Sequence, residues 1–572
     1  MEYSAILHDM DKRFCYAIDK DLFVIRVQVK KDDIKEIILH YEDKYIPLEW
    51  KDTRKRIPMK KVATSQFHDY YEAQLQMHLI CLRYYFEFTD MQGEKVYYGN
   101  YEFDKESITN RDRMFDCPQN LREEEMFEVP EWAANKVVYQ IFPSRFAATE
   151  PVDKELWYKA PITPMDDLHG NLRGIIEHMD DIQNLGIDVL YMTPIFQSNS
   201  CHKYDTTDYY QIDPSFGTTE DLKELVQKAH ERGMKVVLDA VYNHTGREFF
   251  AFADILENGE KSKYRDWYFI DGFPLKSEWG EIPNFKCFGY YGGMPKLNLK
   301  NPEVEKYITD VACYWIKECD IDGWRLDVGD EISHFFWKNF RKAVKAVKKD
   351  MLIIGEIWHY AGDFLEGDEW DTVMNYPFYL NLIDLLADEK ITVSQFVQNL
   401  GYLKGRLHKN CYPLMWNLID SHDTARFLHL CNDNKKKQHL AAAFQLLLPG
   451  MPMIYYGDEY AMPGANDPDC RRGMYWDEEY QDKEMYEWYK RLIQVRKSHA
   501  CIVEGELAGS VTEDEEGTIV LIRKNGEETI AMIFNCSSSA KKFNEYTQKY
   551  NLLTENTFDG NVEGFDAAVI VL

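Results

Sequence analysis

The strongest constraint on the fold is a run of eight short apolar segments that alternate with amphipathic helical segments. The segments cover residues 137–141, 187–192, 235–239, 321–327, 352–356, 372–375, 414–420 and 452–456. Short apolar strands separated by helices are typical of parallel sheets that are buried on both faces. Because eight such units close a sheet on itself, we predict an α/β fold with a (β/α)8 TIM barrel at residues 128–501.

The segments between these strands carry start and stop signals of helices. Thr218 with Asp221 three residues later predicts a capping box, and Gly233 is a typical stop. The buried face of that helix is predicted at Leu222, Leu225, Val226 and Ala229. Asn301 followed by Pro302 predicts a second helix start.

The alternation is interrupted once, between the third and fourth strands. Residues 245–299 are too long for a loop and one helix, and they hold 13 aromatic residues in 55. We therefore predict a small inserted domain at 245–299, beside the face of the barrel that would carry the active site.

Both ends of the chain are predicted to be β-structure. Hydrophobic Phe23, Ile25, Val27 and Val29 recur with a two-residue period, which indicates a strand, and residues 83–89 form a second such run. Residues 119–128 predict a linker. Near the other end, Asn525-Gly526 lies between two strand-like runs and predicts a hairpin. We expect a β-sandwich at 1–127 and another at 502–572.

The charge balance restricts the partners. The chain has 67 basic and 97 acidic residues, which gives a net charge of −30. Such a field repels phosphate backbones and anionic membranes, so we expect no nucleic-acid or membrane partner and a neutral substrate. Aromatic residues reach 14%, and their rings suit flat, partly apolar partners such as sugars.

Several absences indicate a cytoplasmic protein. No apolar run approaches 18 residues, and the first residues lack the basic and apolar regions of a signal peptide. The 12 cysteines are scattered without a CxxC pair, so we expect free, buried thiols.

Four of the predicted strands end in an acid or lead into one: Asp239, Asp327, Glu356 and Asp423. In an eight-stranded α/β barrel, catalytic groups lie at the carboxyl ends of the strands. Carboxyl groups that share a pocket cannot all ionise freely, so their pKa values separate. Cleavage of glycosidic bonds uses this arrangement: one carboxylate attacks while a carboxylic acid protonates the leaving oxygen.

Neighbouring residues indicate how the acids divide the work. Arg325 lies two residues before Asp327 on the same face, and its guanidinium is expected to keep Asp327 ionised, as a nucleophile requires. Glu356 lies in an apolar stretch with Trp358, which is expected to raise its pKa, as a general acid requires. His244 and His422 are candidate donors to sugar hydroxyls.

Each of these residues also has a structural interpretation. A single strand-end acid is often a helix cap or an ion-pair partner, and for Asp239 alone that is the favoured explanation. His422 with Asp423 would also suit a metal site, and Trp358 and Tyr204 would also suit a core. The joint pattern of four acids, one arginine and two histidines favours catalysis.

These motifs resemble the α-amylase family of glycoside hydrolases over residues 130–480. The matching runs are GIDVLYMTPIF (186–196), HKYDTTDYYQIDPSFG (202–217), DAVYNH (239–244), GWRLDVGDE (323–331), GEIWH (355–359) and SHD (421–423). MPKLN (294–298) and NDPDCRRGMYWD (466–477) are similar to the group of neopullulanases, cyclomaltodextrinases and maltogenic amylases. A leading β-module at 1–127, resembling a starch-binding domain, also fits that group.

The resemblance implies a role for each site residue. Asp327 would be the nucleophile, Glu356 the acid/base and Asp423 the stabiliser of the distorted sugar. The implied substrate contacts and positioning groups are Tyr204, Asp239, His244, Arg325, Trp358, His359, His422, Asp467 and Arg471. The implied reaction is retaining hydrolysis of α-1,4 links, with some α-1,6 cleavage, in cyclodextrins, malto-oligosaccharides or pullulan; the carboxyl groups of a retaining pair lie ~5–5.5 Å apart.

The chain departs from its relatives in two places. Relatives often bind calcium in the loop after the first strand, but residues 145–172 lack most of the acidic and amide ligands, and Asn171 replaces a common Asp. Since calcium takes about 6–8 oxygen ligands, we expect no required cofactor and no strong metal site. Asn243, a calcium ligand in ordinary amylases, is expected to make a structural hydrogen bond instead. Gly329 and Asp330 replace residues common beside the aglycone subsites, which leaves bond and acceptor preference open.

Two other functions remain open from the residues alone. A transglycosylase uses the same scaffold, and a high yield of transfer sugars would identify it. A non-catalytic carbohydrate-binding subunit would be expected to have lost Asp327 or Glu356, whereas both are present. Relatives often dimerise through the leading module, so the resemblance also implies a homodimer through residues 1–127.

Overall fold

The computed structural model describes residues 1–45, 54–76, 81–100, 102–118, 126–276 and 282–572. The chain divides into two compact units. The first comprises Met1–Val129, Ala361–Asp371 and Ser394–Tyr412, and the second comprises Pro130–Tyr360, Thr372–Val393 and Pro413–Leu572. The domain limits 127/128 and 501/502 stay predictions, because the second unit includes the C-terminal sheets and the first includes two segments from the predicted barrel range.

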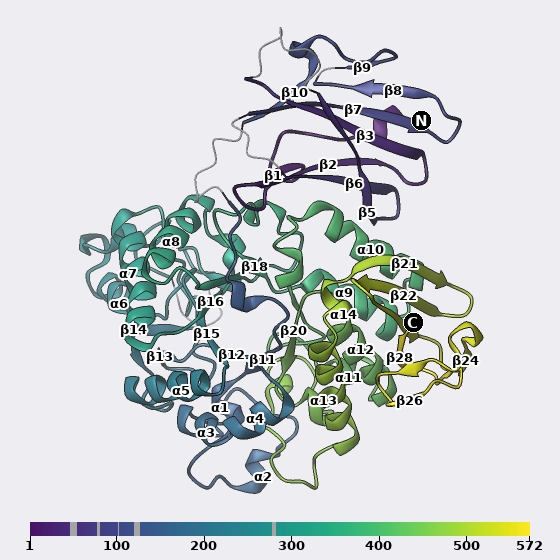
Figure 1. The fold of residues 1–572 in the computed structure, drawn as a ribbon. Helices are drawn as coiled ribbons and strands as arrows, with labels where there is room; N and C mark the ends of the chain where they lie inside the picture. Colours follow the sequence, from purple (N-terminus) through teal and green to yellow (C-terminus); the bar gives the residue numbers. More distant parts are fainter. Residues whose placement is uncertain (46–53, 77–80, 101, 119–125, 277–281) are drawn as a thin grey trace. The chain divides into compact units, whose positions relative to one another are not determined.

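The second unit contains the predicted barrel of parallel strands (Figure 1). Its strands are β11 (Val138–Ile141), β12 (Val189–Met192), β15 (Lys235–Ala240), β16 (Gly323–Leu326), β17 (Leu352–Gly355), β18 (Thr372–Val373), β19 (Trp416–Asn417) and β20 (Met451–Tyr455). The order around the sheet is β18-β17-β16-β15-β12-β11-β20-β19, and a parallel bridge between Met374 and Trp416 joins the two ends. Each strand overlaps its predicted segment, so the barrel prediction is confirmed.

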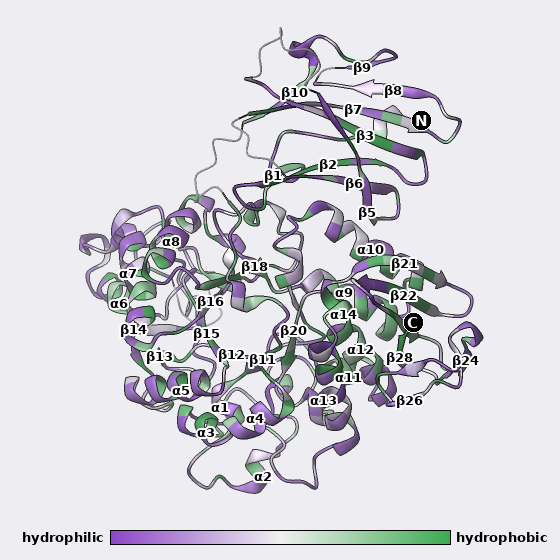
Figure 2. Cartoon of the chain, in the orientation of Figure 1, coloured by the Kyte–Doolittle hydropathy of each residue, from purple (hydrophilic) through white to green (hydrophobic). Residues whose placement is uncertain are grey.

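Helices connect the barrel strands, and α13 follows the last of them. Besides α6, which is described below, the α-helices of six or more residues are α3 (Leu172–Glu177), α4 (Met179–Leu185), α5 (Thr219–Glu231), α7 (Pro302–Cys319), α8 (His334–Val347), α9 (Tyr376–Leu382), α10 (Val393–Arg406), α12 (Lys435–Leu447) and α13 (Lys483–Ser498). Thr218 and Asp221 form the predicted capping box at α5, and the Asn301 side chain caps α7. In Figure 2 the hydrophobic colour follows barrel strands such as β20, whereas α5 is mostly hydrophilic.

The interruption after β15 forms irregular structure around a short helix, α6 (Phe250–Asn258). Isolated β-bridges connect its later part: Tyr268 to Leu297, Ile270 to Phe285 and Cys287 to Pro295. A further bridge between His244 and Lys296 ties this segment to the end of β15. This connection brings the inserted segment to the ends of the barrel strands.

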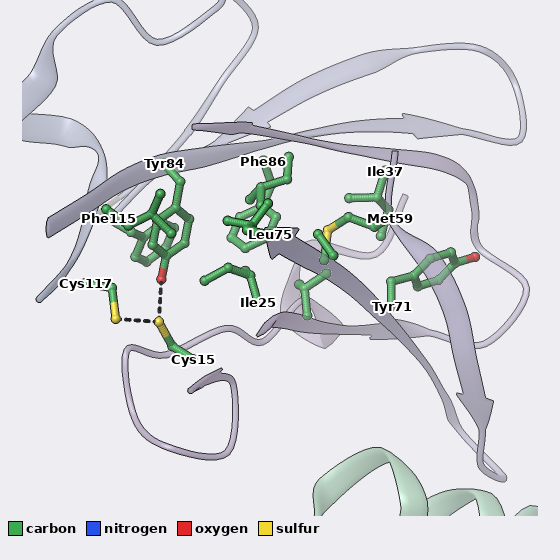
Figure 3. Close-up of a cluster of buried hydrophobic side chains, with 14 of the residues drawn as sticks. Cys15, Ile25, Ile37, Met59, Tyr71, Leu75, Tyr84, Phe86, Phe115 and Cys117 are labelled. Carbon is green, nitrogen blue, oxygen red and sulfur yellow. Dashed lines mark hydrogen bonds between the residues drawn. The ribbon is translucent and has the colours of Figure 1, made fainter. Parts of the chain in front are cut away.

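The first unit contains two antiparallel sheets. One has the order β1 (Cys15–Ala17), β2 (Leu22–Lys30), β6 (His68–Gln76), β5 (Lys60–Thr64); the other contains β4 (Lys55–Pro58), β3 (Ile34–Asp43), β7 (Cys81–Asp90), β8 (Lys95–Tyr98) and β9 (Phe103–Asp104), with β10 (Phe115–Pro118) paired to β7. Side chains from both sheets, among them Ile25, Ile37, Leu75 and Phe86, form one buried cluster (Figure 3). Most of the predicted linker at 119–128 lies outside the described residues.

Strand β2 departs from the simple alternation that its sequence predicts. Arg26, expected on a polar face, is 1% exposed. Its guanidinium pairs with Glu72 at 2.5 Å and donates from Nη1 to the carbonyl of Leu407 at 2.9 Å. Because Leu407 belongs to the segment Ser394–Tyr412 of the same unit, this second face of the strand is covered rather than solvated.

The C-terminal part of the second unit is a six-stranded sheet and a two-stranded one. The larger contains β21 (Glu506–Glu513), β22 (Thr518–Asn525), β23 (Glu528–Asn535), β28 (Asp566–Val571), β25 (Tyr550–Asn551) and β26 (Asn556–Thr557); the smaller pairs β24 (Lys541–Lys542) with β27 (Asn561–Val562). The predicted hairpin joins β22 and β23, with Asn525 opposite Glu528. Its two loop residues are therefore Gly526 and Glu527, one position later than predicted.

All twelve cysteines are free thiols. In the part of the chain that the structure describes, no helix combines the length and the apolar character needed to cross a membrane.

Candidate active site

A pocket of about 440 Å³ opens in the second unit, where the barrel strands β15, β16 and β17 end. Eight of the predicted site residues line it: Tyr204, His244, Asp327, Glu356, Trp358, Asp423, Asp467 and Arg471. Three more, Asp239, Arg325 and His422, lie behind this wall and are 0–1% exposed. The parallel register that aligns the strand ends is the reason why residues so far apart in sequence meet here.

Arg325 is the centre of the charge network below the pocket. It lies on β16 opposite Asp239 of β15. Its Nη1 donates to both carboxylate oxygens of Asp239, at 3.0 and 2.9 Å, and to Oδ1 of Asp327 at 2.9 Å. Its Nη2 lies 2.8 Å from Oε2 of Glu356. One buried guanidinium therefore contacts three buried carboxyl groups.

This sharing changes the ionisation expected for the nucleophile. Burial raises the pKa of the Asp327 carboxyl well above its ordinary value, although the charge of Arg325 opposes the rise. Burial likewise raises the pKa of Asp239 to about 6 and raises the pKa of Glu356. Arg325 lowers the pKa of Asp327, as expected, but burial outweighs this effect, so the ionised state of Asp327 stays a prediction. The expected rise of the pKa of Glu356 is confirmed.

The two oxygens of Asp327 have different surroundings. Oδ1 accepts the hydrogen bond from Arg325, whereas Oδ2 is buried and has no hydrogen-bond partner among the residues described. The free oxygen belongs to a carboxyl group that lines the pocket. The network thus holds one oxygen in place and leaves the other for a ligand.

Glu356 is held by the backbone of the residue that follows Asp327. The N–H of Val328 donates to Oε2 of Glu356 at 3.0 Å, and Trp358 Nε1 lies 3.3 Å from Oε1. Val328 has φ 47°, a left-handed conformation that is rare for a β-branched residue. This strained backbone directs the N–H toward Glu356, and sequence reasoning gave no sign of it.

His422 is fixed by three partners. Its Nδ1 lies 2.8 Å from Nε2 of Gln140, and its Nε2 lies 3.1 Å from Oδ2 of Asp423 and hydrogen bonds to the hydroxyl of Tyr204. The rings of Tyr204 and His422 are parallel within 4°. Burial lowers the pKa of His422 well below its ordinary value, so the ring is neutral. Asp423 is therefore oriented by an uncharged imidazole.

Arg471 supplies the cation beside Asp423. Its Nη2 lies 3.3 Å from Oδ1 of Asp423, and its Nη1 lies 2.8 Å from Oδ1 of Asp467. Its Nε donates to the backbone carbonyl of His422 at 2.7 Å. The guanidinium of Arg471 therefore bridges the carboxylates of Asp423 and Asp467.

Aromatic rings also line the pocket. Phe288 of the inserted segment stacks on His244, with ring centroids 5.1 Å apart. Burial lowers the pKa of His244 to about 3, and its Nε2 has no partner among the described residues, so a neutral imidazole nitrogen is available to a ligand. Trp358 stacks on Tyr376 at 4.0 Å. His359 is exposed and is not part of the pocket wall.

Sequence reasoning missed several groups at this site. Four residues that it did not single out line the pocket: His202, Phe288, Met294 and Val328. Asp330, which it did single out, lines the pocket as well. Behind it, Gln140 orients His422, and the hydroxyl of Tyr191 donates to Asp239 at 2.7 Å. His202, Met294 and Tyr191 belong to motifs that mark the family, so those motifs were the available signal. For Gln140 the available signal was weaker: it is a polar residue inside an apolar strand.

The loop after β11 does not suit a cation. Oδ1 of Asn171 accepts the N–H of Gly174 at 2.8 Å, and its Nδ2 points toward Thr149 Oγ1 and the carbonyl of His169, at 3.2 Å each. Both of those oxygens therefore accept a hydrogen bond from the amide of Asn171. Asn243 accepts a hydrogen bond from Lys296. Within the described ranges, no group of three His, Cys, Asp or Glu side chains has a metal-binding arrangement.

Comparison with known proteins places this site in a family. Residues 140–480 match the family described as Alpha amylase, catalytic domain, and residues 1–119 match Alpha amylase, N-terminal ig-like domain. A cyclomaltodextrinase from Geobacillus thermopakistaniensis is 42% identical over 94% of this chain and 92% of its own. Neopullulanase 2 from Thermoactinomyces vulgaris is 39% identical over 94% and 91%.

A solved cyclomaltodextrinase structure covers 100% of both chains with a TM-score of 0.94 and 37% identity. The matched catalytic region, from residue 140 to 480, contains every residue that lines the pocket. Sequence and fold therefore agree, and the chain belongs to the α-amylase family of glycoside hydrolases.

Proposed function

We propose that this glycoside hydrolase cleaves α-1,4 glucosidic bonds in cyclodextrins and short malto-oligosaccharides, with retention of configuration. The observation that carries the proposal is the asymmetry of Asp327: Arg325 holds Oδ1, whereas Oδ2 has no partner in the described chain and belongs to the pocket wall. A nucleophile needs one fixed and one free oxygen. Glu356 lines the same pocket.

In the first step, Oδ2 of Asp327 bonds to the anomeric carbon as the glycosidic C–O bond breaks. Glu356 gives its proton to the leaving oxygen, which departs as an alcohol. We assign the proton retained by the three coupled acids to Glu356 in the substrate complex, where the glycosidic oxygen accepts it. Burial of all three acids supports a retained proton, because one guanidinium cannot balance three carboxylates.

In the second step, ionised Glu356 takes a proton from water, and the water oxygen bonds to the anomeric carbon. The ester bond to Asp327 breaks, so both carboxyl groups return to their starting states. Asp423 accepts hydrogen bonds from the sugar hydroxyls as positive charge develops on the ring. His244, neutral because of burial, offers its unpartnered Nε2 to the same sugar.

The pocket supports a preference for short or cyclic glucans. Phe288, Trp358 and Tyr204 present aromatic surface around a volume of about 440 Å³, which suits a few sugar rings. The relatives named cyclomaltodextrinase and neopullulanase support the same substrate class. Asp330 lies on the pocket wall where the aglycone would leave, so it is a candidate determinant of acceptor choice.

Product analysis on β-cyclodextrin, pullulan and soluble starch in parallel tests the proposal. We expect fast opening of cyclodextrin and slow attack on starch. Faster turnover of starch would replace the substrate assignment with an open-cleft amylase, and no turnover of any substrate would favour a binding subunit. A product mixture dominated by transfer sugars would identify a transglycosylase.

Variants test the roles. Asp327→Asn is expected to lower kcat at least ~1,000-fold with substrate binding retained, because an amide is a poor nucleophile. Glu356→Gln should lose as much on natural substrates but far less on an aryl glycoside whose leaving group needs no proton. Asp330→Asn, in the same pocket, is the matched control and should keep at least about a tenth of kcat.

We propose a cytoplasmic homodimer as the working form. The intracellular maltogenic amylase of Bacillus subtilis, 38% identical over 94% of this chain and 91% of its own, supports the compartment. Twelve free thiols support a reducing one. Light scattering at working concentration tests the assembly: a particle of 67.6 kDa would exclude the dimer.

A further inference from the structure

Two buried acids lie below the loops that carry Asp423 and Arg471, and the mechanism above does not use them. Asp420 follows β19 and Asp458 follows β20, and each is 1% exposed. Asp420 Oδ2 accepts the N–H of Phe427 at 2.7 Å. Asp458 Oδ1 accepts from Nη1 of Arg426 at 2.9 Å.

Each acid keeps one oxygen without a donor. Asp420 Oδ1 and Asp458 Oδ2 are both buried and accept no hydrogen bond from any described residue. The two carboxyl groups are close enough to influence each other's ionisation. Two buried carboxylates beside a single guanidinium leave one negative charge unbalanced, and one proton shared by the pair would remove it.

The charges around the pair lead to the same conclusion. Within the described residues, the ion pair from Arg426 is the one cation contact of Asp458 at 4 Å or less, and Asp420 has none. Glu459 next to the pair bonds to the hydroxyl of Tyr139 at 2.6 Å. Burial raises the pKa of Asp420, and it raises that of Asp458 well above its ordinary value.

Apart from Arg426 and Glu459, the described side chains packed around the pair are neutral. The guanidinium of Arg426 lies over the rings of Tyr455 and Tyr456, at 4.1 and 5.1 Å from their centroids. Gln438 of α12 donates to the backbone carbonyl of Asp458 at 3.0 Å. Tyr489 of α13 is buried beside the acids, and burial raises its pKa, so it stays neutral.

Arg426 links the pair to the pocket. Its Nε donates to the carbonyl of Cys470 at 3.1 Å, and its backbone N–H donates to Gly464. Cys470 precedes Arg471, whose Nε reaches the carbonyl of His422, next to Asp423. One side chain thus ties the loop of Asp423 to the loop of Arg471.

We propose that Asp420 and Asp458 share one proton and that this neutralised pair, with Arg426, is the positioning element that holds Asp423 and Arg471 in the cleavage pocket. The inference rests on the proposed function of that pocket. Asp420 and Asp458 contact no substrate; they act through the two loops. Removal of the shared proton at high pH leaves two adjacent charges against one guanidinium, so the loops separate and kcat falls.

Two substitutions at Asp458 separate the proton from the packing. In Asp458→Asn the amide oxygen accepts from Arg426 and the amide nitrogen donates to Asp420, which copies the protonated pair at every pH. We expect kcat within about threefold of wild type near neutral pH and a weaker fall of kcat at alkaline pH. Asp458→Ala removes the carboxylate that accepts from Nη1 of Arg426 and the neighbour of Asp420 Oδ1, and it should lower kcat more than tenfold with a smaller change in KM.

Thermal unfolding gives a readout that does not need activity. A carboxyl group whose pKa is higher in the folded chain than in the unfolded chain costs stability as pH rises above its unfolded value of ~4. The melting temperature of Asp458→Asn should therefore gain on wild type progressively as pH rises. Glu459→Gln is the comparison, because it removes the neighbouring acid and keeps both members of the pair. Since the charge of Glu459 contributes to the raised pKa of Asp458, the alkaline fall of kcat should persist in this variant and begin at lower pH.

Equal pH slopes of melting temperature in wild type and Asp458→Asn would overturn the shared proton. A folded Asp458→Asn that loses as much kcat as Asp458→Ala would also overturn it, since an ionised carboxylate would then be needed. If the wild-type enzyme is active, either of these two results leaves the glycosidase assignment intact. If wild type turns over no glucan, the proposed function fails, whereas the melting experiment still tests the pair.

Discussion

Nη1 of Arg325 donates to Oδ1 of Asp327 at 2.9 Å and leaves Oδ2 of that carboxylate without a partner in the described chain. The same guanidinium also contacts Asp239 and Glu356. Its planar fork can serve three carboxyl groups at once, which the single ammonium of lysine cannot do.

Arg325→Lys is accordingly expected to lower kcat by at least ~100-fold, with the chain still folded by circular dichroism. Arg173→Lys is the control, because Arg173 also bridges two carboxylates, Asp221 and Glu224, but on the surface. It should leave kcat unchanged. Equal losses in the two variants would contradict a specific role for the guanidinium of Arg325.

Gln140→Leu tests the support of His422. The change leaves Nδ1 of His422 buried without its partner at 2.8 Å, so the imidazole loses its fixed orientation toward Asp423. We expect kcat to fall about tenfold and stability to fall by about 1–3 kcal/mol.

Gln445→Leu provides the comparison for that variant. Gln445 is equally buried, and its Nε2 donates to two backbone carbonyls away from the pocket, those of Asn417 and Met453. It should lose similar stability with kcat preserved. If both variants lose kcat alike, the effect of Gln140 is general destabilisation.

Asp239→Asn should shift the acid side of the pH–activity profile. Burial is the main cause of the raised pKa of Asp327, and the charge of Asp239 raises it further. Without that charge the nucleophile ionises at lower pH, so the acid limb of kcat/KM should move down by ~0.5 unit or more while its maximum also falls. A limb that stays in place would show that Asp239 does not influence the ionisation of Asp327.

A chelator should leave the enzyme unchanged. The amide of Asn171 donates toward Thr149 and the carbonyl of His169, where a cation would need free oxygens. Melting temperature and turnover are expected to be the same with millimolar EDTA and with millimolar calcium. A fall in melting temperature with EDTA that calcium reverses would contradict this.

Cys15 and Cys117 are expected to form a disulfide when the chain refolds with oxidised glutathione. Their Sγ atoms lie 2.7 Å apart in the buried cluster and join β1 to β10 (Figure 3). Each glutathione disulfide would accept two electrons and leave as two thiols. Because about 100 residues are enclosed, the bond should stabilise the first unit by about 3–5 kcal/mol.

Thiol titration under denaturing conditions should then find two fewer than the twelve thiols of the reduced chain. Cys15→Ser is the control and should show neither the loss of a thiol pair nor the added stability. An unchanged count in oxidised wild type would rule out the bond.

The sequence alone determined the barrel and the ring of acids. Eight apolar segments with helices between them leave few other ways to bury so many strands. Parallel strands in one barrel end at the same edge, so Asp239, Asp327 and Glu356 had to meet once their segments were recognised as strands. Helix caps such as Thr218 were also readable, because a cap depends on residues only three positions apart.

Only the tertiary structure decided how charge is shared within that ring. The contacts of Arg325 with three acids, of Gln140 with His422 and of Asp420 with Asp458 join residues that are far apart along the chain. Such pairs depend on where each side chain points after the strands have closed into a barrel, and no local spacing records that. The strained backbone of Val328 is likewise a product of packing, because its own side chain disfavours it.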